Sequence, residues 1–226
     1  MQDAIDTSHP HQRGISLISL LIGMLLAMLA LLAMLMLFRT VVHNSAEAGR
    51  DSRQNGDRSL ALLMAHQHLH DAGYGLPAAT FATDLQPCNA TLDPDTGALP
   101  DCTAAAGASP WTVNTLLWRF DSDRDGTQPP VCAGLHSSEQ GFYYLMPVSC
   151  ETSGWPTSWQ PQWLLSDIDG QAPLELKVEK HATAAGACQA LGAAGSGGVS
   201  VTLRGQHTGS GTALESSTCL VNFPPQ

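Results

Sequence analysis

The hydrophobic pattern divides the chain near its N-terminus. Residues 15–38 form a run of 24 residues without a charged side chain, and the residues before it are few and mostly polar. A helix of this length is about 36 Å long, which exceeds the roughly 30 Å of a bilayer's hydrocarbon core. After Arg39, polar and apolar residues are mixed. The pattern therefore predicts a short head (1–14), a transmembrane helix (15–38) and a body outside the membrane.

The helix is expected to continue beyond the membrane through residues 39–76. Residues 41–72 contain no proline and only two glycines, and Gly73, Gly75 and Pro77 then end the helical pattern. On this continuation Leu60, Leu63 and Met64 are expected to cover a globular body. Charged residues are expected to give it a face in water: Glu47, Arg50, Asp51, Arg53, Asp57 and Arg58.

One face of the membrane segment carries small residues. Gly23, Ala27 and Ala30 follow the spacing i, i+4, i+7, which places them in a single stripe. Small residues allow two helices to approach closely in lipid. The stripe predicts a surface for helix–helix contact.

Residues 77–226 are expected to form a β-rich body. The segment 77–110 is rich in Ala, Thr, Pro and Asp and is interpreted as loop. Trp155, Trp159 and Trp163 alternate with prolines, which predicts an irregular segment over 155–165. Strands are predicted at 111–120, 141–148, 174–180, 198–204 and 218–223, the last two forming a hairpin around a loop at 205–217. The predicted fold class is α+β, a long helix packed on an antiparallel sheet.

Six cysteines all follow the membrane run, and none has C-x-x-C spacing. An even set on one side of a membrane is typical of structural disulfides in an oxidising compartment. Short loops close at the lowest entropic cost, so the sequential pairing is favoured over the others. Free buried thiols are the alternative. The favoured pairs are Cys88–Cys102, Cys132–Cys150 and Cys188–Cys219.

Composition narrows the class of protein. Lys and Arg number 10 against 20 Asp and Glu, giving a net charge of -10, and charged residues are only 13% of the chain. A nucleic-acid-binding body would usually show a basic face, so no nucleic-acid partner is expected. No hydrolase, metalloprotease or phosphate-loop motif occurs. Ser196 and Ser210 lie in glycine-rich stretches, which rarely hold a nucleophile rigidly, and the chain is not expected to be an enzyme.

Two groups of residues have metal-ligand spacing, and neither is favoured as a site. Asp121, Asp123, Asp125 and Gly126 match the first half of a calcium loop, but Cys132 stands where the bidentate acid belongs. An Asp/Gly turn is the favoured interpretation and calcium the alternative; no other cofactor is expected. His66, His68 and His70 include two side chains one helical turn apart, a spacing that suits zinc. Solvated helix histidines are the favoured interpretation.

A cleavage signal precedes the apolar run. Residues 13–18 read RGISLI, and no small-residue cleavage site follows Phe38, where an ordinary secretory signal would have one. This arrangement resembles the class III signal of type IV prepilins. The resemblance implies that prepilin peptidase cuts after Gly14, that residues 1–14 are a leader peptide, and that Ile15 becomes the methylated N-terminus. A single-pass signal anchor with a chance glycine is the alternative.

Two further features refine the resemblance. Residues 70–75 read HDAGYG, which is similar to the close of the N-terminal helix in PilW-like minor pilins. Ser19 stands at the fifth mature position, where the family usually has Glu. In the family that Glu is thought to neutralise a neighbouring subunit's N-terminal amine. Because Ser19 cannot do this, the resemblance implies a minor subunit near the tip. Cys188–Cys219 would resemble the C-terminal disulfide loop of pilins.

The resemblance implies a minor pilin that primes or caps a type IV pilus and supports pilus biogenesis, adhesion and twitching motility. Its partners would be other minor pilins, the major pilin, a tip adhesin, prepilin peptidase and the inner-membrane assembly platform. It would first be a single-pass inner-membrane protein with its body in the periplasm, and later part of the surface pilus. The alternatives are a minor pseudopilin of a type II secretion system and a non-polymerising, membrane-anchored periplasmic binding domain.

Overall fold

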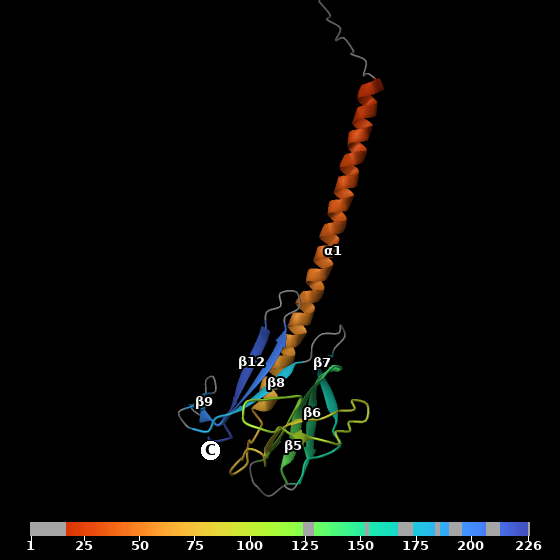
Figure 1. The fold of residues 1–226 in the computed structure, drawn as a ribbon. Helices are drawn as coiled ribbons and strands as arrows, with labels where there is room; N and C mark the ends of the chain where they lie inside the picture. The colour runs from red at the N-terminus through yellow and green to blue at the C-terminus, as the bar shows by residue number, and fades with distance from the viewer. Residues whose placement is uncertain are drawn as a thin grey trace, which may run out of the picture. The chain divides into compact units, whose positions relative to one another are not determined.

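The computed structural model has one long N-terminal helix and antiparallel β-sheets, an α+β architecture (Figure 1). The predicted fold class is confirmed. The structure describes residues 17–123, 129–151, 154–166, 174–183, 186–189, 196–206 and 213–225.

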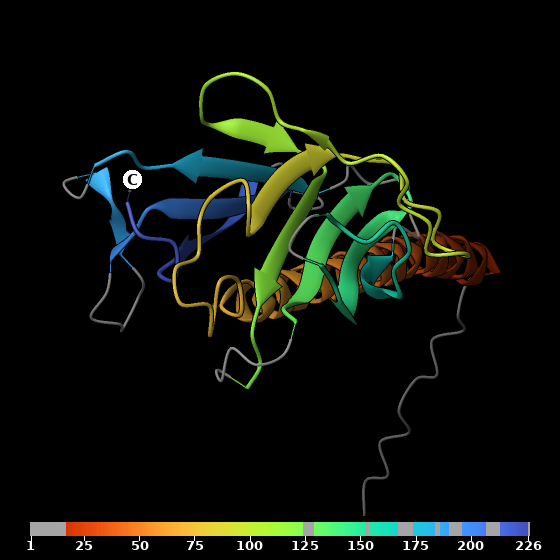
Figure 2. The same cartoon turned by 90° about the horizontal axis from the view of Figure 1, so that it is seen from below.

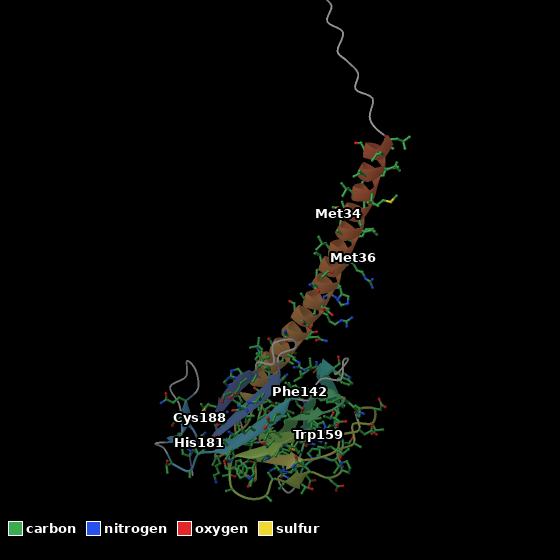
Figure 3. All side chains as sticks on the ribbon, turned by 45° about the horizontal axis from the view of Figure 1, so that its top comes forward. Met34, Met36, Phe142, Trp159, His181 and Cys188 are labelled. Carbon is green, nitrogen blue, oxygen red and sulfur yellow. A yellow bond between two sulfur atoms is a disulfide. The ribbon has the colours of Figure 1, made fainter. Side chains whose placement is uncertain are left out.

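Helix α1 spans Leu17–Leu69, a total of 53 residues. The chain divides into two compact units, Met1–Arg50 and Asp51–Gln226, and the boundary lies within this helix. In the first unit the helix is long and apolar enough to cross a membrane. Figure 3 labels Met34 and Met36 on this part of the helix, and both are exposed.

In the second unit the end of α1 packs on the body. Its buried face consists of small and apolar residues with one arginine: Arg58, Ala61, Leu62, Ala65 and Leu69. The predicted contact face was wrong for Leu60 and Leu63, which are 55% and 54% exposed, and the predicted water face was wrong for Arg58, which is only 4% exposed. Met64 is half-buried, and the other charged residues predicted to face water are exposed apart from half-buried Asp51. Small side chains on the buried face let the helix backbone approach the sheets closely, and this favours Ala61 and Ala65 over leucines at the contact.

Helix α1 ends at Leu69 and not at residue 76 as predicted. Gly73 lies in the turn that follows the helix. The φ of Gly73 is 72°, a backbone conformation that residues with a Cβ rarely adopt. Its amide donates to the carbonyl of Arg119 (2.8 Å). An added Cβ would lie 2.8 Å from the Phe223 ring. The chain therefore turns sharply at the end of α1, where it also passes close to the C-terminal segment.

The larger sheet has six strands in the order β2-β1-β4-β5-β6-β7, all antiparallel. Strand β4 lies in the middle and is buried along its whole length. The bounds are β1 Leu85–Asn89, β2 Thr103–Ala104, β4 Thr115–Phe120, β5 Val131–Ser138, β6 Gly141–Ser149 and β7 Pro161–Ser166.

The second sheet has four antiparallel strands in the order β12-β11-β8-β3, and a small third sheet pairs β10 with β9. Figure 2 shows the two larger sheets beside the end of α1. The bounds are β3 Trp111–Val113, β8 Glu175–Lys180, β9 Cys188–Gln189, β10 Ser196–Gly197, β11 Val199–Gln206 and β12 Ala213–Leu220.

The predicted strand at 111–120 is two strands in different sheets. The chain changes sheet at Asn114, whose side chain accepts from the Ala90 amide and donates to the Ala90 carbonyl, both at 2.9 Å. These two hydrogen bonds take the place of backbone pairing between strands at Asn114, where the chain passes from one sheet to the other. The imperfect alternation of this segment reflects the change of sheet.

Other strand predictions had mixed outcomes. The strands at 141–148 and 174–180 are confirmed, as is the pairing of the C-terminal hairpin, although its second strand ends at Leu220 and not at residue 223. The loop interpretation of 77–110 was wrong at β1 and β2, and the irregular segment 155–165 was wrong at β7, where Pro161 starts an edge strand. The loop at 205–217 is shorter than predicted because the hairpin strands extend to Gln206 and from Ala213. Strand β5 was missed.

The core lies on both faces of the six-stranded sheet. One cluster joins the end of α1 to both larger sheets, and includes Leu69, Trp118, Phe142 and Val178. The other lies beneath the loops on the opposite face and includes Tyr143 and Trp159. Figure 3 labels Phe142 and Trp159, one from each cluster.

Three disulfides connect the pairs that short loop closure favours. They are Cys88–Cys102, Cys132–Cys150 and Cys188–Cys219, with Cα separations of 5.4, 5.6 and 5.6 Å. The first two lie in the core cluster beneath the loops. The third ties β9 to β12, so each bridge connects strands or loops of the body.

Candidate assembly helix and helix–sheet junction

The apolar part of α1 exposes its side chains along its whole length. Every described residue from 17 to 38 is exposed, Ser19 included. The residues of the predicted cleavage, Gly14 and Ile15, lie outside the described residues. Nothing within the described chain covers this apolar surface, which requires lipid or other protein in a cell.

The small-residue stripe (Gly23, Ala27 and Ala30) is open. A Cβ added at Gly23 would meet no atom within 4 Å. The small size of these residues therefore has no role in packing within the described chain. A role in contact with another helix is consistent with this finding.

A second exposed strip lies on the body part of α1. We call Gly56, Leu60 and Leu63 the outer strip; they have the same i, i+4, i+7 spacing as the stripe. Gly56 also has no atom within 4 Å of an added Cβ. The sequence identified these leucines but assigned them to the wrong side of the helix, because adjacent faces of α1 both carry apolar residues.

Two of the three histidines near the end of α1, His66 and His68, contact the sheets. The Nδ1 atom of His66 lies 2.6 Å from the Thr218 hydroxyl on β12, and its Nε2 lies 3.1 Å from Nε2 of His70. The ring of His68 stacks on Tyr144 of β6, with centroids 3.7 Å apart. His66 and His68 are half-buried, and burial lowers the pKa of both. The prediction of solvated histidines was wrong for these two and holds for exposed His70.

Arg119 is a buried cation that sequence reasoning did not single out. Its side chain on β4 donates to the carbonyls of Thr83, Glu151 (2.9 Å) and Gly154 (2.8 Å). It also stacks over Trp155 at 4.4 Å, and Asp84 lies 4.0 Å away. Burial lowers the pKa of Arg119, and Asp84 opposes the effect. The sequence signal that could have indicated this buried cation is a single arginine within an apolar β-segment.

His136 is a second buried polar residue that the sequence did not indicate. It is 1% exposed, and its Nδ1 lies 2.8 Å from the Thr115 hydroxyl across the β4–β5 pair. Burial lowers its pKa to about 4. The ring is therefore neutral at neutral pH and acts as a structural hydrogen-bonding group.

The candidate calcium residues are partly described. Asp121 is 5% exposed, and its carboxylate accepts from the Asp123 amide at 3.3 Å. This is the bond of an Asp turn. Asp125 lies outside the described residues. Among the described residues, no three His, Cys, Asp or Glu side chains are grouped to hold a metal ion.

Of the two serines considered as nucleophiles, only Ser196 lies among the described residues. It lies in β10, opposite Gln189 of β9. Ser210 lies outside the described residues.

Comparison with known proteins yields no relative. No protein-family model matches the chain, and neither a curated protein nor a solved structure is detectably similar to it.

Proposed function

We propose that the chain is a PilW-like minor pilin: a non-enzymatic structural subunit that assembles with other minor pilins to prime or cap a type IV pilus. It would be held in the inner membrane before assembly, with its body in the periplasm. Prepilin peptidase would remove residues 1–14, and the helix would then leave the membrane for a helical bundle with other pilins.

The observation that carries the proposal is that one continuous helix contains both an exposed apolar part and a part that packs on the body. The first part of α1 is apolar and exposed on every side, and the last part packs on a disulfide-bonded antiparallel body. A membrane anchor alone needs about 20 apolar residues. The continuation of the same helix into the body supports transfer of the whole unit from membrane to bundle. The cleavage signal at 13–18 supports the same process.

Mass spectrometry of the N-terminus tests the proposal. The chain is extracted from membranes of a piliated host, with and without its prepilin peptidase. We expect an N-terminus at methylated Ile15 only when the peptidase is present. A Gly14→Glu variant should remain uncut because its bulky charged side chain replaces the small residue before the cut. A Ser16→Ala variant is the matched control and should be cut normally.

Two outcomes would favour other functions. An intact Met1 or Gln2 terminus in the presence of the peptidase would overturn the proposal in favour of a non-polymerising anchored domain. Correct cleavage followed by co-purification with secretion pseudopilins, and not with pilins, would assign the chain to a type II secretion system. Co-purification with minor pilins and the major pilin is the expected result.

A further inference from the structure

His66, in the last turn of α1, and His70, directly after the helix, bring two imidazole nitrogens together. Their Nε2 atoms are 3.1 Å apart, on residues one helical turn from each other. A divalent ion about 2.05 Å from both nitrogens would form an N–metal–N angle of about 98°. This angle lies between the roughly 90° of square-planar sites and the roughly 109° of tetrahedral sites. The pair is thus spaced to chelate one ion.

A second contact orients His66 as a ligand. Its Nδ1 lies 2.6 Å from the hydroxyl of Thr218, which is 1% exposed. When Nδ1 carries the proton and donates to this oxygen, the Nε2 lone pair faces His70. Histidine ligands usually donate their other ring N–H in this way, and the contact fixes both tautomer and ring orientation.

The main chain of the pair is also held. Nδ2 of Asn222 lies within hydrogen-bond distance of the His70 carbonyl (3.4 Å) and of the Ala72 carbonyl (2.9 Å). These contacts fix the last turns of α1 against the segment after β12. The ring of His70 is exposed, so an ion can reach the pair from solvent.

We propose that His66 and His70 form a two-histidine site for one divalent transition-metal ion that prefers imidazole, such as Zn²⁺, with water in the remaining positions. The bound ion would replace the Nε2–Nε2 contact. Because Thr218 links His66 to β12, the ion would stabilise the end of α1 and its junction with the four-stranded sheet. The inference does not depend on the proposed function in pilus assembly.

Zinc titration calorimetry on the full chain in detergent, purified without a histidine tag, tests the site. We expect wild-type protein to bind one Zn²⁺ that a His70→Gln variant binds at least about tenfold more weakly, since chelation by two ligands is lost. Thr218→Val keeps the side-chain volume and removes the hydroxyl that orients His66. It should weaken zinc binding by about tenfold.

His68→Gln is the matched control, because it removes a histidine from the same helix without touching the pair. It should bind zinc as wild type does. Equal zinc affinity in wild-type and His70→Gln protein would overturn the site, as would equal weakening by His68→Gln. A wild-type dissociation constant above about 1 mM would also overturn it. Thermal unfolding with and without zinc provides a second measurement: zinc should raise the midpoint of wild type more than that of His70→Gln.

Discussion

At the residue scale, Arg119 shows how a buried charge can organise loops. Three carbonyls from two separate loops converge on its guanidinium, and Trp155 covers it. Replacing Arg119 with Met would leave these carbonyls and Asp84 without their cation. We expect the free energy of unfolding to fall by about 3–5 kcal/mol, measured by urea unfolding of the full chain in detergent.

Arg204 provides the matched control. It pairs with Glu215 at 2.9 Å, but both side chains are about half exposed to solvent. Arg204→Met should lower the free energy of unfolding far less than Arg119→Met does, because exposed pairs contribute little. Similar losses in the two variants would show that the buried network around Arg119 adds nothing special to stability.

The lowered pKa of buried His136 leads us to expect that the stability of the fold depends on pH. Its pKa is about 4 in the folded chain, against an ordinary value of 6.5. Between these values the unfolded chain binds a proton that the folded chain does not. The stability from neutral His136 is therefore fully present above pH 6.5 and is lost as the pH falls toward 4. The loss is about 1.4 kcal/mol per pH unit, or about 2 kcal/mol at pH 5.

Urea unfolding at pH 7.5 and pH 5 measures this effect. His136→Gln should lose about 2 kcal/mol less than wild type over this interval. His181→Gln, which alters a half-buried histidine near Ser200, is the control for loss of a histidine and should behave as wild type. His136→Gln should still lose some stability between pH 7.5 and pH 5, because the pKa values of His66 and His68 are also lowered. If His136→Gln loses as much stability as wild type over this pH interval, the burial of a neutral His136 is contradicted.

These residues mark the limit of what the sequence predicts about sites. The disulfide pairs followed from loop length, since each joins cysteines that are near in sequence. Arg119 and His136 owe their burial to partners 32–36 and 21 residues away. No local pattern encodes such contacts. The metal-ligand spacing of His66 and His70 was visible in the sequence, but the contact with Thr218 was not.

At the element scale, the packing of α1 leads us to expect effects of very different size for substitutions of two adjacent leucines. Leu62 is 4% exposed and packs in the core, whereas Leu63 is 54% exposed. Leu62→Ala should lower the free energy of unfolding by about 2–5 kcal/mol, since it leaves a cavity. Leu63→Ala should change it by about 0.5 kcal/mol or less. Urea unfolding measures both, and equal losses would contradict the orientation of α1.

The orientation of α1 could not be predicted because apolar residues occur on more than one of its faces. Its existence as one long helix was predictable, since no proline interrupts it, but it ends at Leu69, before the predicted residue 76. The strands with clear alternation were also predictable, β8 above all. Strand β1 was not, because Pro87 and Cys88 lie within it, and β7 was hidden by Pro161 at its start and by the nearby Pro156. Backbone pairing with other strands overrides the weak local preference of both.

At the scale of the whole molecule, the division between Arg50 and Asp51 separates the apolar part of α1 from the body. The body carries its own core and all three disulfides. The apolar half of α1 has exposed side chains throughout. A substitution in the small-residue stripe should therefore leave the folding of the body intact and act only on contacts with other chains.

Ala27→Leu and Ala33→Leu separate these effects in a matched pair. Both add the same bulk to an exposed position of the apolar helix, but Ala33 lies about a quarter-turn from the stripe. If the chain assembles through the stripe, Ala27→Leu should lower co-purification with other minor pilins by about fivefold or more, equivalent to roughly 1 kcal/mol of lost helix contact. Ala33→Leu should lower it little. Thermal unfolding of the body should be unchanged in both, because both side chains are exposed. Equal co-purification of the two variants would contradict close packing along the stripe, and would favour an apolar helix that serves only as an anchor.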